Sequence, residues 1–486
     1  MGKRTETGVI VVGTGFSGLG MAIQLRKDGR DDFVILEKAH DVGGTWRDNS
    51  YPGCACDIPS HMYSFSFEQN PGWSRAYSPQ PEIWRYMRDV ADKHDLRRFI
   101  SFGQEMIGAR WDADENRWHV TTQSGDEFVA EALTMGVGAL HRPQIPDLPG
   151  IEKFAGRAFH SAEWEHDYDF AGQRVAVVGT GASAVQFVPK IAPQVESLTL
   201  FQRTPPWIMP KSDHDMAGWL RGLFKTLPLA QRAYRNFIYW ALEARAIGFN
   251  GQQWVMKIGQ RLAKRNINKA VGDPALRAKL TPDYTMGCKR VLISNDYYPA
   301  LARDNVDVVT DGVAEVREHS VVDAAGVEHE VDAIVYGTGF HVIDAFGNLE
   351  IVGRDGRNLG KEWEAEGMRT HLGITVNGFP NLFLLLGPNT GLGHNSVVFM
   401  IEAQISYIAQ ALRLARGRAI DPRPEAQERF NAGIQRKLAK GIWTQGGCKS
   451  WYLDAKGVNR TIWPGFTWRY WLDTRTLRRG DYELLD

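Results

Sequence analysis

Val9-Ile10-Val11-Val12-Gly13-Thr14-Gly15-Phe16-Ser17-Gly18 is the stretch that decides the fold. An unbroken apolar run is typical of a buried parallel strand, and the glycines after it predict a tight turn into a helix. Gly13 permits the turn, Gly15 lets the backbone approach a pyrophosphate, and Gly18 lets helix and strand pack closely. The N–H groups at the start of the helix would bind the phosphates. The stretch therefore predicts a Rossmann-like α/β domain that binds a dinucleotide.

The acidic residue after the next strand indicates which dinucleotide fits. Phe33 to Leu36 predicts that strand, and Glu37 follows it, where a carboxylate can bind both ribose hydroxyls. The same charge repels a 2′-phosphate, so the site suits FAD or NAD, and we assign it to FAD. A glycine turn without a ligand is the alternative. The FAD contacts predicted from this unit are Gly13, Gly15, Phe16, Gly18, Glu37 and Lys38.

A second unit repeats the arrangement with the opposite charge. The strand at Arg174 to Val178 leads into Gly179-Thr180-Gly181-Ala182-Ser183-Ala184, and Arg203 stands 24 residues after Gly179, the same spacing as Glu37 from Gly13. A guanidinium beside a hydroxyl suits a 2′-phosphate, although a solvated strand-end charge is the alternative. We predict NADPH here, passing hydride to the flavin. The predicted contacts are Gly179, Gly181, Ala182, Ser183, Arg203 and Thr204.

The chain is divided by a helical stretch between the two units. We predict a discontinuous FAD domain (residues 1–140 and 331–486), an NADPH domain (141–214 and 281–330) and a helical insertion (215–280). The stretch Trp219 to Phe249 is rich in aromatic residues and Arg and could touch a membrane surface. Helices packed over a substrate pocket are the interpretation we favour.

Composition excludes several classes of protein. Lys plus Arg and Asp plus Glu number 57 each, so no net field attracts nucleic acid or an anionic membrane. No signal peptide or membrane-spanning run is recognisable, and we expect no stable membrane insertion. The cysteines are too few for a disulfide framework, which favours the reducing cytoplasm, and no metal site is predicted. They are Cys54, Cys56, Cys288 and Cys448, of which we interpret the first two as packing residues.

Two longer segments closely resemble fingerprints of the type I Baeyer–Villiger monooxygenases. Gly43 to Asp57 fills every fixed position of the pattern Gly/Ala-Gly-x-Trp, four residues, Phe/Tyr-Pro-Gly/Met, three residues, Asp. Phe154 to Glu165 is similar to Phe-x-Gly-x3-His-x3-Trp followed by Pro or Asp, and departs only at Glu165. The likeness spans residues 8 to about 465. Flavin monooxygenases that oxidise amines and sulfides differ at Trp164, where they carry Tyr or Phe.

The resemblance implies an enzyme that uses FAD, NADPH and O2 to convert a ketone into an ester or lactone through a flavin C4a-peroxide. It implies Arg290 as the catalytic cation, Asp57 as its carboxylate partner, and Lys289 as a ligand of the 2′-phosphate. Gln445 to Tyr452 resembles the mobile control loop, in which Trp451 would bind NADP⁺. The cofactor contacts implied in this way are Gly44, Thr45, Trp46, Asp57, Tyr63, Lys289, Arg290, Asn389 and Trp451.

Three alternatives stay open at this point. A flavin monooxygenase that oxygenates nitrogen or sulfur is disfavoured by Asp57, Trp164 and Arg290. An NADPH-dependent flavin or disulfide reductase is disfavoured because no redox cysteine pair is suitably placed, and a non-catalytic flavin-binding module would leave two complete sites idle. His160 is either an interdomain coupling residue or a satisfied buried histidine. The sequence does not indicate which ketone is the substrate or what the oligomeric state is. The residues around Arg290 and Trp451 are more similar to those of family branches that act on aryl or bulky ketones.

Overall fold

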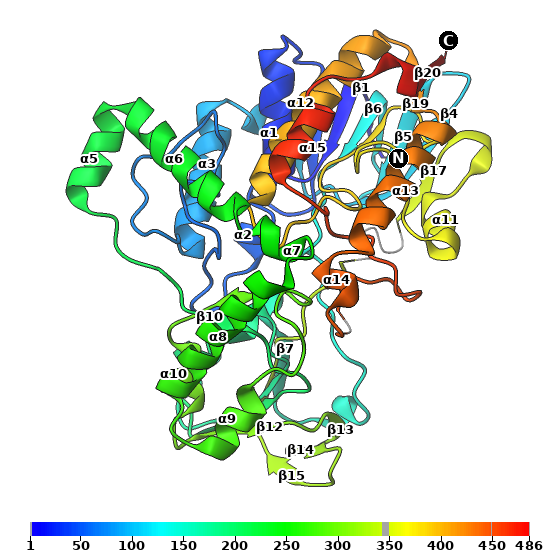
Figure 1. The fold of residues 1–486 in the computed structure, drawn as a ribbon. Coiled ribbons are helices and arrows are strands. Elements are labelled where there is room, and N and C mark those ends of the chain that lie inside the picture. The colour runs from blue at the N-terminus through cyan, green and yellow to red at the C-terminus, as the bar shows by residue number, and fades with distance from the viewer. Residues whose placement is uncertain (1, 343–348, 449, 486) are drawn as a thin grey trace.

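Two α/β domains lie one above the other in the computed structural model, which describes residues 2–342, 349–448 and 450–485 (Figure 1). Each domain is built on a largely parallel sheet, and one strand of each sheet leads into one of the two glycine turns. Both chain termini belong to the upper domain (Figure 1). The predicted fold class, two Rossmann-like domains with a helical insertion, is confirmed.

The sheet of the first domain has the strand order β17-β4-β5-β6-β1-β2-β3, with β18 beside β6. Alternate residues of β1 enter two different cores, because Val9 and Val11 pack on one face of the sheet and Ile10 and Val12 on the other. Both faces are covered, which explains the unbroken apolar run. The strands are β1 (Arg4–Val12), β2 (Phe33–Glu37), β3 (Ile100–Phe102), β4 (Met106–Asp112), β5 (Arg117–Thr122), β6 (Glu127–Met135), β17 (Glu350–Val352) and β18 (Leu382–Leu384).

Helices α1 and α12 cover one face of this sheet, side by side (Figure 1). Helix α12 is the one described helix long and apolar enough to cross a membrane, but most of it is buried against α1 and α15 as a core helix. The helices of this domain are α1 (Phe16–Lys27), α2 (Thr45–Asp48), α3 (Gln80–Lys93), α11 (Leu359–Glu366), α12 (Val397–Ala415), α13 (Pro424–Leu438), α14 (Ile442–Gln445) and α15 (Thr467–Thr474). A small ribbon of β19 (Ala419–Pro422) and β20 (Tyr482–Leu485) closes the C-terminus.

The sheet of the second domain is fully parallel, in the order β12-β9-β8-β16-β7. Its strands are β7 (Arg157–His160), β8 (Arg174–Val178), β9 (Ser197–Phe201), β12 (Val306–Val309) and β16 (Ala333–Tyr336). The domain boundary predicted at residue 331 is wrong in one respect. Strand β16 pairs with β8 and β7 of this sheet, so the chain returns to the first domain only after Tyr336. The other elements are α4 (Ala182–Ile191), α10 (Tyr297–Leu301), β13 (Val313–Arg317), β14 (Ser320–Asp323) and β15 (Glu328–Glu330).

Two segments of chain cross between the domains and pair with each other. Pro143 and Phe340 form an antiparallel bridge, and the N–H of Gln144 donates to the carbonyl of Gly339 at 2.9 Å. The two connections between the domains therefore lie side by side, and their pairing restricts how the two domains can move relative to each other.

The helical insertion does not form a third body, because its helices divide between the two domains. The buried Arg235 of α6 donates to the Ser64 carbonyl of the first domain at 3.0 Å, whereas the carbonyl of Lys279 accepts from Gln202 of the second at 2.9 Å. The helices are α5 (Gly218–Thr226), α6 (Pro228–Glu243), α7 (Ala246–Phe249), α8 (Gln253–Ala270) and α9 (Pro274–Leu280), flanked by paired β10 (Ile208–Met209) and β11 (Leu292–Ile293).

The expectation that the aromatic residues of this insertion pack over a pocket is wrong for three of them. Trp219, Phe237 and Trp240 are 73%, 69% and 60% exposed, although Phe224 and Phe249 are buried. Helical periodicity identifies an apolar face, but it does not show that another element covers that face.

Candidate active site

A cavity of about 180 Å³ opens at the carboxyl end of β1. Both sides are lined by segments singled out from the sequence, the glycine turn after β1 and the start of the Gly43–Asp57 fingerprint. The predicted FAD contacts in the lining are Gly13, Gly15, Phe16, Glu37, Lys38, Gly44, Thr45, Trp46 and Tyr63.

The geometry of the glycine turn fits a pyrophosphate. Gly13 has φ +94°, and a Cβ on Gly18 would lie 1.8 Å from the carbonyl oxygen of Gly13, so neither position accepts a side chain. A Cβ on Gly15 would meet nothing within 4 Å, because that position faces the open cavity. Helix α1 begins after Gly15 without a side-chain cap, which leaves its first N–H groups available to an anion.

Glu37 is held rigidly at the edge of the cavity. Its Oε2 accepts from the backbone N–H of Thr14 at 3.0 Å and from the Thr14 hydroxyl at 2.5 Å. Its Oε1 accepts from the N–H of Ala39 at 2.9 Å and lies 3.1 Å from Nη1 of Arg47. The carboxylate is thus fixed where a ribose would bind. Sequence reasoning missed Thr14 and Arg47, although both stand inside quoted motifs, because neither position has a prescribed role there.

The second glycine turn has a different third position. Gly179 has φ +100°, and Ala184 occupies the place that Gly18 has in the first turn. The larger residue is accommodated because Gly337 of the strand end opposite has no side chain, and a Cβ there would lie 2.8 Å from Cβ of Ala184. Helix α4 also starts without a side-chain cap, after Gly181, so its exposed first residue Ala182 offers the same kind of anion site.

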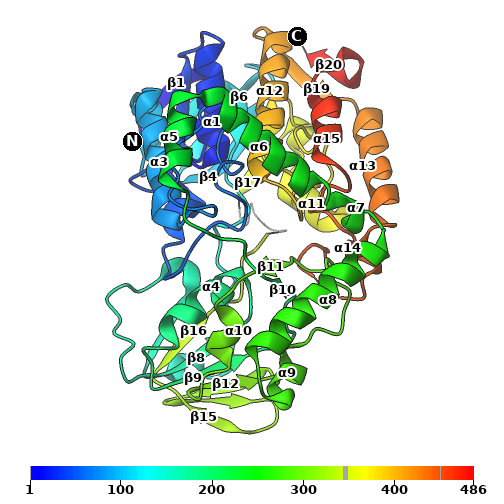
Figure 2. The ribbon, with the colours of Figure 1, turned by 60° about the vertical axis from the view of Figure 1, so that its left-hand side comes forward.

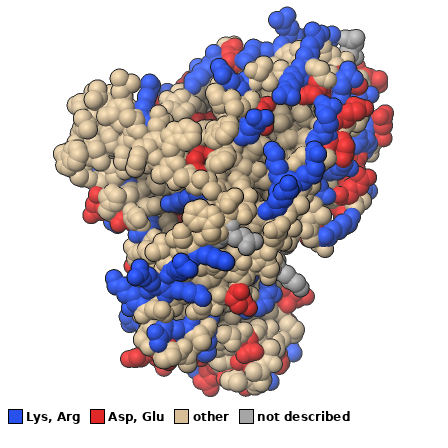
Figure 3. Space-filling view, viewed as in Figure 1, with Lys and Arg blue, Asp and Glu red and all other residues tan. Residues whose placement is uncertain are grey.

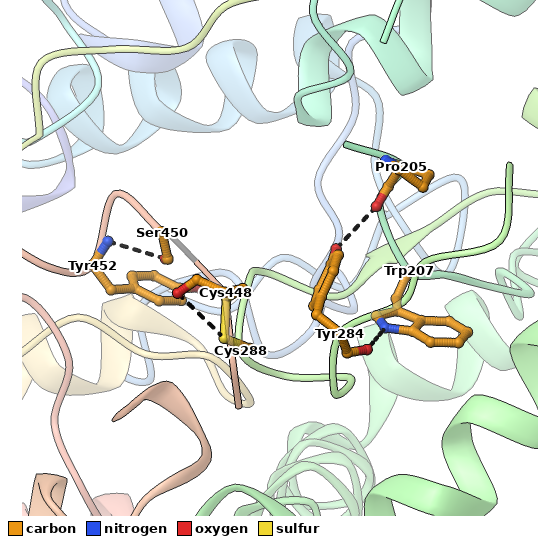
Figure 4. Close-up of a disulfide and its surroundings, with 7 residues drawn as sticks. All are labelled: Pro205, Trp207, Tyr284, Cys288, Cys448, Ser450 and Tyr452. Atoms are coloured by element: carbon orange, nitrogen blue, oxygen red, sulfur yellow. Dashed lines mark hydrogen bonds between the residues drawn. A yellow bond between two sulfur atoms is a disulfide. The ribbon is translucent and has the colours of Figure 1, made fainter. Parts of the chain in front are cut away.

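Arg203 and Lys289, predicted to bind the 2′-phosphate, come together. The Tyr284 hydroxyl donates to the carbonyl of Pro205, two residues after Arg203, at 3.1 Å (Figure 4). The ring of Tyr284 lies 5.1 Å from Nζ of Lys289. Burial lowers the pKa of Lys289, and the positive charge of Arg203 lowers it further. Within the described residues neither cation forms an ion pair. Asp283 opposes the shift without forming an ion pair, and two neighbouring cations that no carboxylate pairs with fit a phosphate dianion.

Arg290 and Asp57 form an ion pair across the two fingerprint regions. Nε of Arg290 lies 3.0 Å from Oδ2 of Asp57, and Nη2 donates to the same oxygen. The Asp57 carboxylate raises the pKa of Arg290 against the opposing effect of burial. Tyr63 lines the cavity, and burial raises its pKa, with smaller and opposite effects of the Asp57 and Arg290 charges.

The Gly43–Asp57 fingerprint also joins the two domains. The Tyr51 hydroxyl donates to Oε1 of Gln186 on α4 at 3.0 Å, and Nε2 of Gln186 donates to the carbonyl of Ala55 at 2.9 Å. Gly53 has φ +81°, and a Cβ there would lie 2.6 Å from the carbonyl oxygen of Gln186. The segment from Trp46 to Asp57 therefore runs from the first cavity to helix α4 of the second domain and then to Arg290.

Comparison with known proteins agrees with this geometry. Residues 6–352 match the flavin-binding monooxygenase-like family. A Baeyer–Villiger monooxygenase of Pseudomonas aeruginosa is 50% identical over 98% of this chain and 91% of its own, and one of Streptomyces coelicolor is 49% identical over 98% and 92%. The chain belongs to the Baeyer–Villiger monooxygenases. A steroid monooxygenase solved with NADP is similar in fold, with TM-score 0.89 and 31% identity over 99% of this chain and 100% of that one.

As a Baeyer–Villiger monooxygenase, the protein uses FAD and NADPH. The first site fits FAD through the open face of Gly15, the uncapped helix α1 and the fixed Glu37. The second fits NADPH through the paired cations. The cysteines at 54 and 56 are buried packing residues as expected, and burial raises the pKa of Cys54 to about 12, which keeps it an inert thiol.

The sequence predicted no disulfide framework, but the structure contains one disulfide that was not anticipated. Cys288 and Cys448 form a disulfide across 160 residues (Figure 4). The bond ties the predicted control loop of the monooxygenase to the segment that carries Arg290. Sequence reasoning missed it because the distance between the two residues depends on the packing of the insertion and the C-terminal segment. Lys449 of this loop lies outside the described residues.

Tyr452, next to the predicted ligand Trp451, is a loop residue on which the charges of Arg290 and Asp57 act. It is buried, and its pKa is raised to about 12 by burial, with Arg290 opposing and Asp57 adding to the shift. Trp451 is 43% exposed, with its ring 4.2 Å from that of Tyr452. The Trp-Tyr pair thus presents one ring towards the Arg290–Asp57 pair and leaves the other accessible.

Two further predicted residues of the monooxygenase lie away from the cavity lining. The Asn389 side-chain amide donates to the carbonyls of Asn459 and Ile462 at 3.1 and 3.2 Å, so its role towards FAD stays a prediction. His160 is fully buried, its Nδ1 accepts from the N–H of Ala162 at 3.1 Å, and burial lowers its pKa. A neutral His160 beside the returning segment fits a structural role at the junction.

Proposed function

We propose that this enzyme converts ketones into esters or lactones with O2 and NADPH, and that Arg290, held by Asp57, is the catalytic cation. The observation that carries the proposal is the ion pair between them, in which Nε of Arg290 lies 3.0 Å from Oδ2 of Asp57. A permanently charged, oriented guanidinium is what an oxygen insertion beside a carbonyl requires, because negative charge develops on oxygen during the reaction.

FAD held in the first site would supply the redox chemistry that links oxidation of NADPH to reduction of O2, with one oxygen atom entering the product and the other leaving as water. Arg203 and Lys289 bind the 2′-phosphate, and Glu37 binds the ribose of FAD. Arg290 directs its positive charge at the oxygen of the bound ketone and stabilises the tetrahedral oxyanion. Asp57 fixes the guanidinium and partly offsets its positive field. The site can therefore hold the cationic nicotinamide product as well as the negative charge that develops on oxygen during the insertion.

The buried ring of Tyr452 excludes water from the neighbourhood of Arg290, and Trp451 covers the bound nicotinamide cofactor. Dry surroundings matter because water diverts the reaction to hydrogen peroxide. The substrate is an aryl or otherwise bulky ketone, as the resemblance around Arg290 and Trp451 favours. A structure related to this chain is named as a steroid monooxygenase, and others as cyclohexanone monooxygenases. The enzyme acts in the cytoplasm, where a single disulfide would form and break with redox state.

The test is a panel of cyclic, aryl and bulky ketones incubated with the FAD-loaded enzyme, NADPH and ¹⁸O2, with products identified by mass. One ¹⁸O atom per ester or lactone supports the proposal. Sulfoxides or N-oxides in place of esters would instead support the nitrogen- and sulfur-oxygenating alternative. NADPH oxidation without any oxygenated product would support a reductase.

A further inference from the structure

The helical insertion carries most of the exposed large apolar side chains of the protein. Ten of them lie within residues 219–262, with exposures from 38% to 73%. In α6 and α7, the residues Leu229, Phe237, Trp240 and Ile247 share one helix face, and in α8 so do Trp254, Ile258 and Leu262. We call this surface the α5–α8 face. It consists of Trp219, Leu223, Leu227, Leu229, Phe237, Trp240, Ile247, Trp254, Ile258 and Leu262.

The same stretch is strongly basic, although the whole chain has no net charge. Residues 216–272 contain one acidic residue, Glu243, which is buried and bonded to Asn395 and Thr467. Among the described residues, none of the exposed cations of the stretch forms an ion pair. These nine cations are Arg221, Lys225, Arg232, Arg245, Lys257, Arg261, Lys264, Arg265 and Lys269.

The helices of this face lie on one side of the molecule. Figure 2 shows α5, α6, α7 and α8 as a layer in front of both domains. In Figure 3 an almost uncharged lobe lies over α5 and α6, and basic side chains gather over α8. Helix α15 continues the face beside α6, because the Tyr239 hydroxyl lies 3.1 Å from that of Thr467 and Trp471 is exposed on α15.

We propose that the α5–α8 face docks on the surface of an anionic lipid bilayer. Exposed Trp, Phe and Leu side chains on helices that also carry unpaired Lys and Arg are the composition of helices that lie in a membrane interface. The aromatic and aliphatic side chains enter the headgroup boundary, and the cations bind anionic headgroups. Surface docking of this kind involves no spanning helix, so it is compatible with α12 being a core helix.

Charge selects this occupant over the alternatives. A second copy of the chain that docked through the same face would bring nine unpaired cations against nine others, which is unfavourable. A nucleic acid would pair with the cations, but it would leave the exposed aliphatic side chains Leu229, Ile258 and Leu262 without a partner. An anionic bilayer satisfies both kinds of side chain.

The docked face leads to the active site. Phe249, at the end of α7, stacks on Trp443 of α14 with ring centroids 5.5 Å apart, and Gly287, three residues before Arg290, packs against the same Phe249 ring. A bilayer bound at the α5–α8 face would therefore bring an apolar ketone dissolved in the lipid close to the segment that carries Arg290.

The experiment is flotation of the FAD-loaded enzyme with vesicles of phosphatidylcholine, alone or mixed with phosphatidylglycerol. We expect flotation with the anionic vesicles, little with phosphatidylcholine alone, and a decrease as salt is added. Each cation near an anionic surface strengthens binding about fivefold (about 1 kcal/mol). The pair Arg261→Gln and Arg265→Gln should therefore weaken the partition about 30-fold, and the pair Phe237→Ser and Trp240→Ser should abolish it.

Matched controls remove comparable residues elsewhere, Lys153→Gln with Lys456→Gln for charge, and Ile107→Ser with Val327→Ser for exposed apolar area. Each variant is first shown to bind FAD and to turn over a water-soluble ketone like the unmodified enzyme. The proposal is overturned if the enzyme does not float with anionic vesicles at low salt, or if the controls lose binding equally. It is also overturned if sedimentation shows a dimer that Phe237→Ser with Trp240→Ser converts to a monomer, because a second copy would then occupy the face.

Discussion

The disulfide between Cys288 and Cys448 joins the segment that carries Arg290 to the loop that carries Tyr452. Arg290 is the second residue after Cys288, and the buried Tyr452 is the fourth residue after Cys448. The predicted control loop is therefore joined covalently to the Arg290 segment. We expect any motion of the loop to depend on whether this bond is intact.

Reducing this bond should uncouple NADPH oxidation from oxygen insertion. In the Cys448→Ser variant Tyr452 loses its covalent anchor, so water gains access to the Arg290 site and more hydrogen peroxide and less ester form per NADPH. Closing so long a loop also stabilises the fold by about 2–4 kcal/mol, which should appear as a lower Tm. Peroxide and ester are measured per NADPH, with Cys54→Ser as the matched control. Equal coupling in both variants and in the reduced native enzyme would show that the bond has no catalytic consequence.

Replacing Arg290 should separate the two halves of the reaction. Arg290→Ala is expected to abolish ester formation while FAD is still reduced by NADPH, because the guanidinium acts on the ketone oxygen and not on the nicotinamide. Arg290→Lys should restore little, since an ammonium cannot present the same planar fork to Asp57 and the substrate. Anaerobic flavin bleaching and product mass are the two measurements. Ester formation near the native rate in Arg290→Ala would assign the role to another cation.

Removing Arg203 should narrow the preference for NADPH over NADH. A charge-assisted contact with the 2′-phosphate contributes about 1.5–3 kcal/mol, so the native enzyme should favour NADPH in kcat/KM by well over tenfold. Arg203→Ala should lose most of that preference through KM, with kcat little changed. Arg303→Ala, an exposed cation of the same domain, is the control. Equal use of NADH and NADPH by the native enzyme would contradict the assignment.

The sequence predicted those parts of the site that depend on short-range rules. A glycine turn after an apolar strand has one backbone geometry, so Gly13, Gly15 and Gly18 could be placed from their spacing, and the resemblance brought Asp57 to Arg290. The pairing of β16 with β8, the disulfide at Cys288 and the burial of Tyr452 could not be predicted, because each depends on contacts between segments more than 150 residues apart. Exposure of Trp219 and Phe237 escaped prediction for another reason, since an amphipathic pattern is the same whether its apolar face meets protein, lipid or water.

The affinity for NADPH should begin to weaken at a lower pH than it would if Lys289 had the pKa of an ordinary lysine. Burial and Arg203 lower the pKa of Lys289, so its positive charge is fully present below that pKa and is lost as pH rises through it. The KM for NADPH should therefore rise on the alkaline side while kcat changes less. Lys289→Arg should remove the rise, because a guanidinium stays protonated there. A KM profile that is the same in the native enzyme and in Lys289→Arg would show that Lys289 does not contact the phosphate.

Gly337 and Ala184 provide a test of the second glycine turn that does not depend on the chemistry. A Cβ on Gly337 would lie 2.8 Å from that of Ala184, closer than carbon atoms approach in proteins, and its next contact is an ordinary 3.5 Å. Gly337→Ala should therefore destabilise the second domain by about 1–3 kcal/mol, the usual cost of overpacking, and weaken NADPH binding with FAD content unchanged. Combining it with Ala184→Gly restores the space and should recover most of the loss, because a glycine at that position reproduces the packing of Gly18 against the first strand. The four proteins of this cycle are compared by Tm and by NADPH titration. If the double variant were as unstable as the sum of the two single ones, Ala184 and Gly337 would not be packing partners, and another contact would set the geometry of the turn.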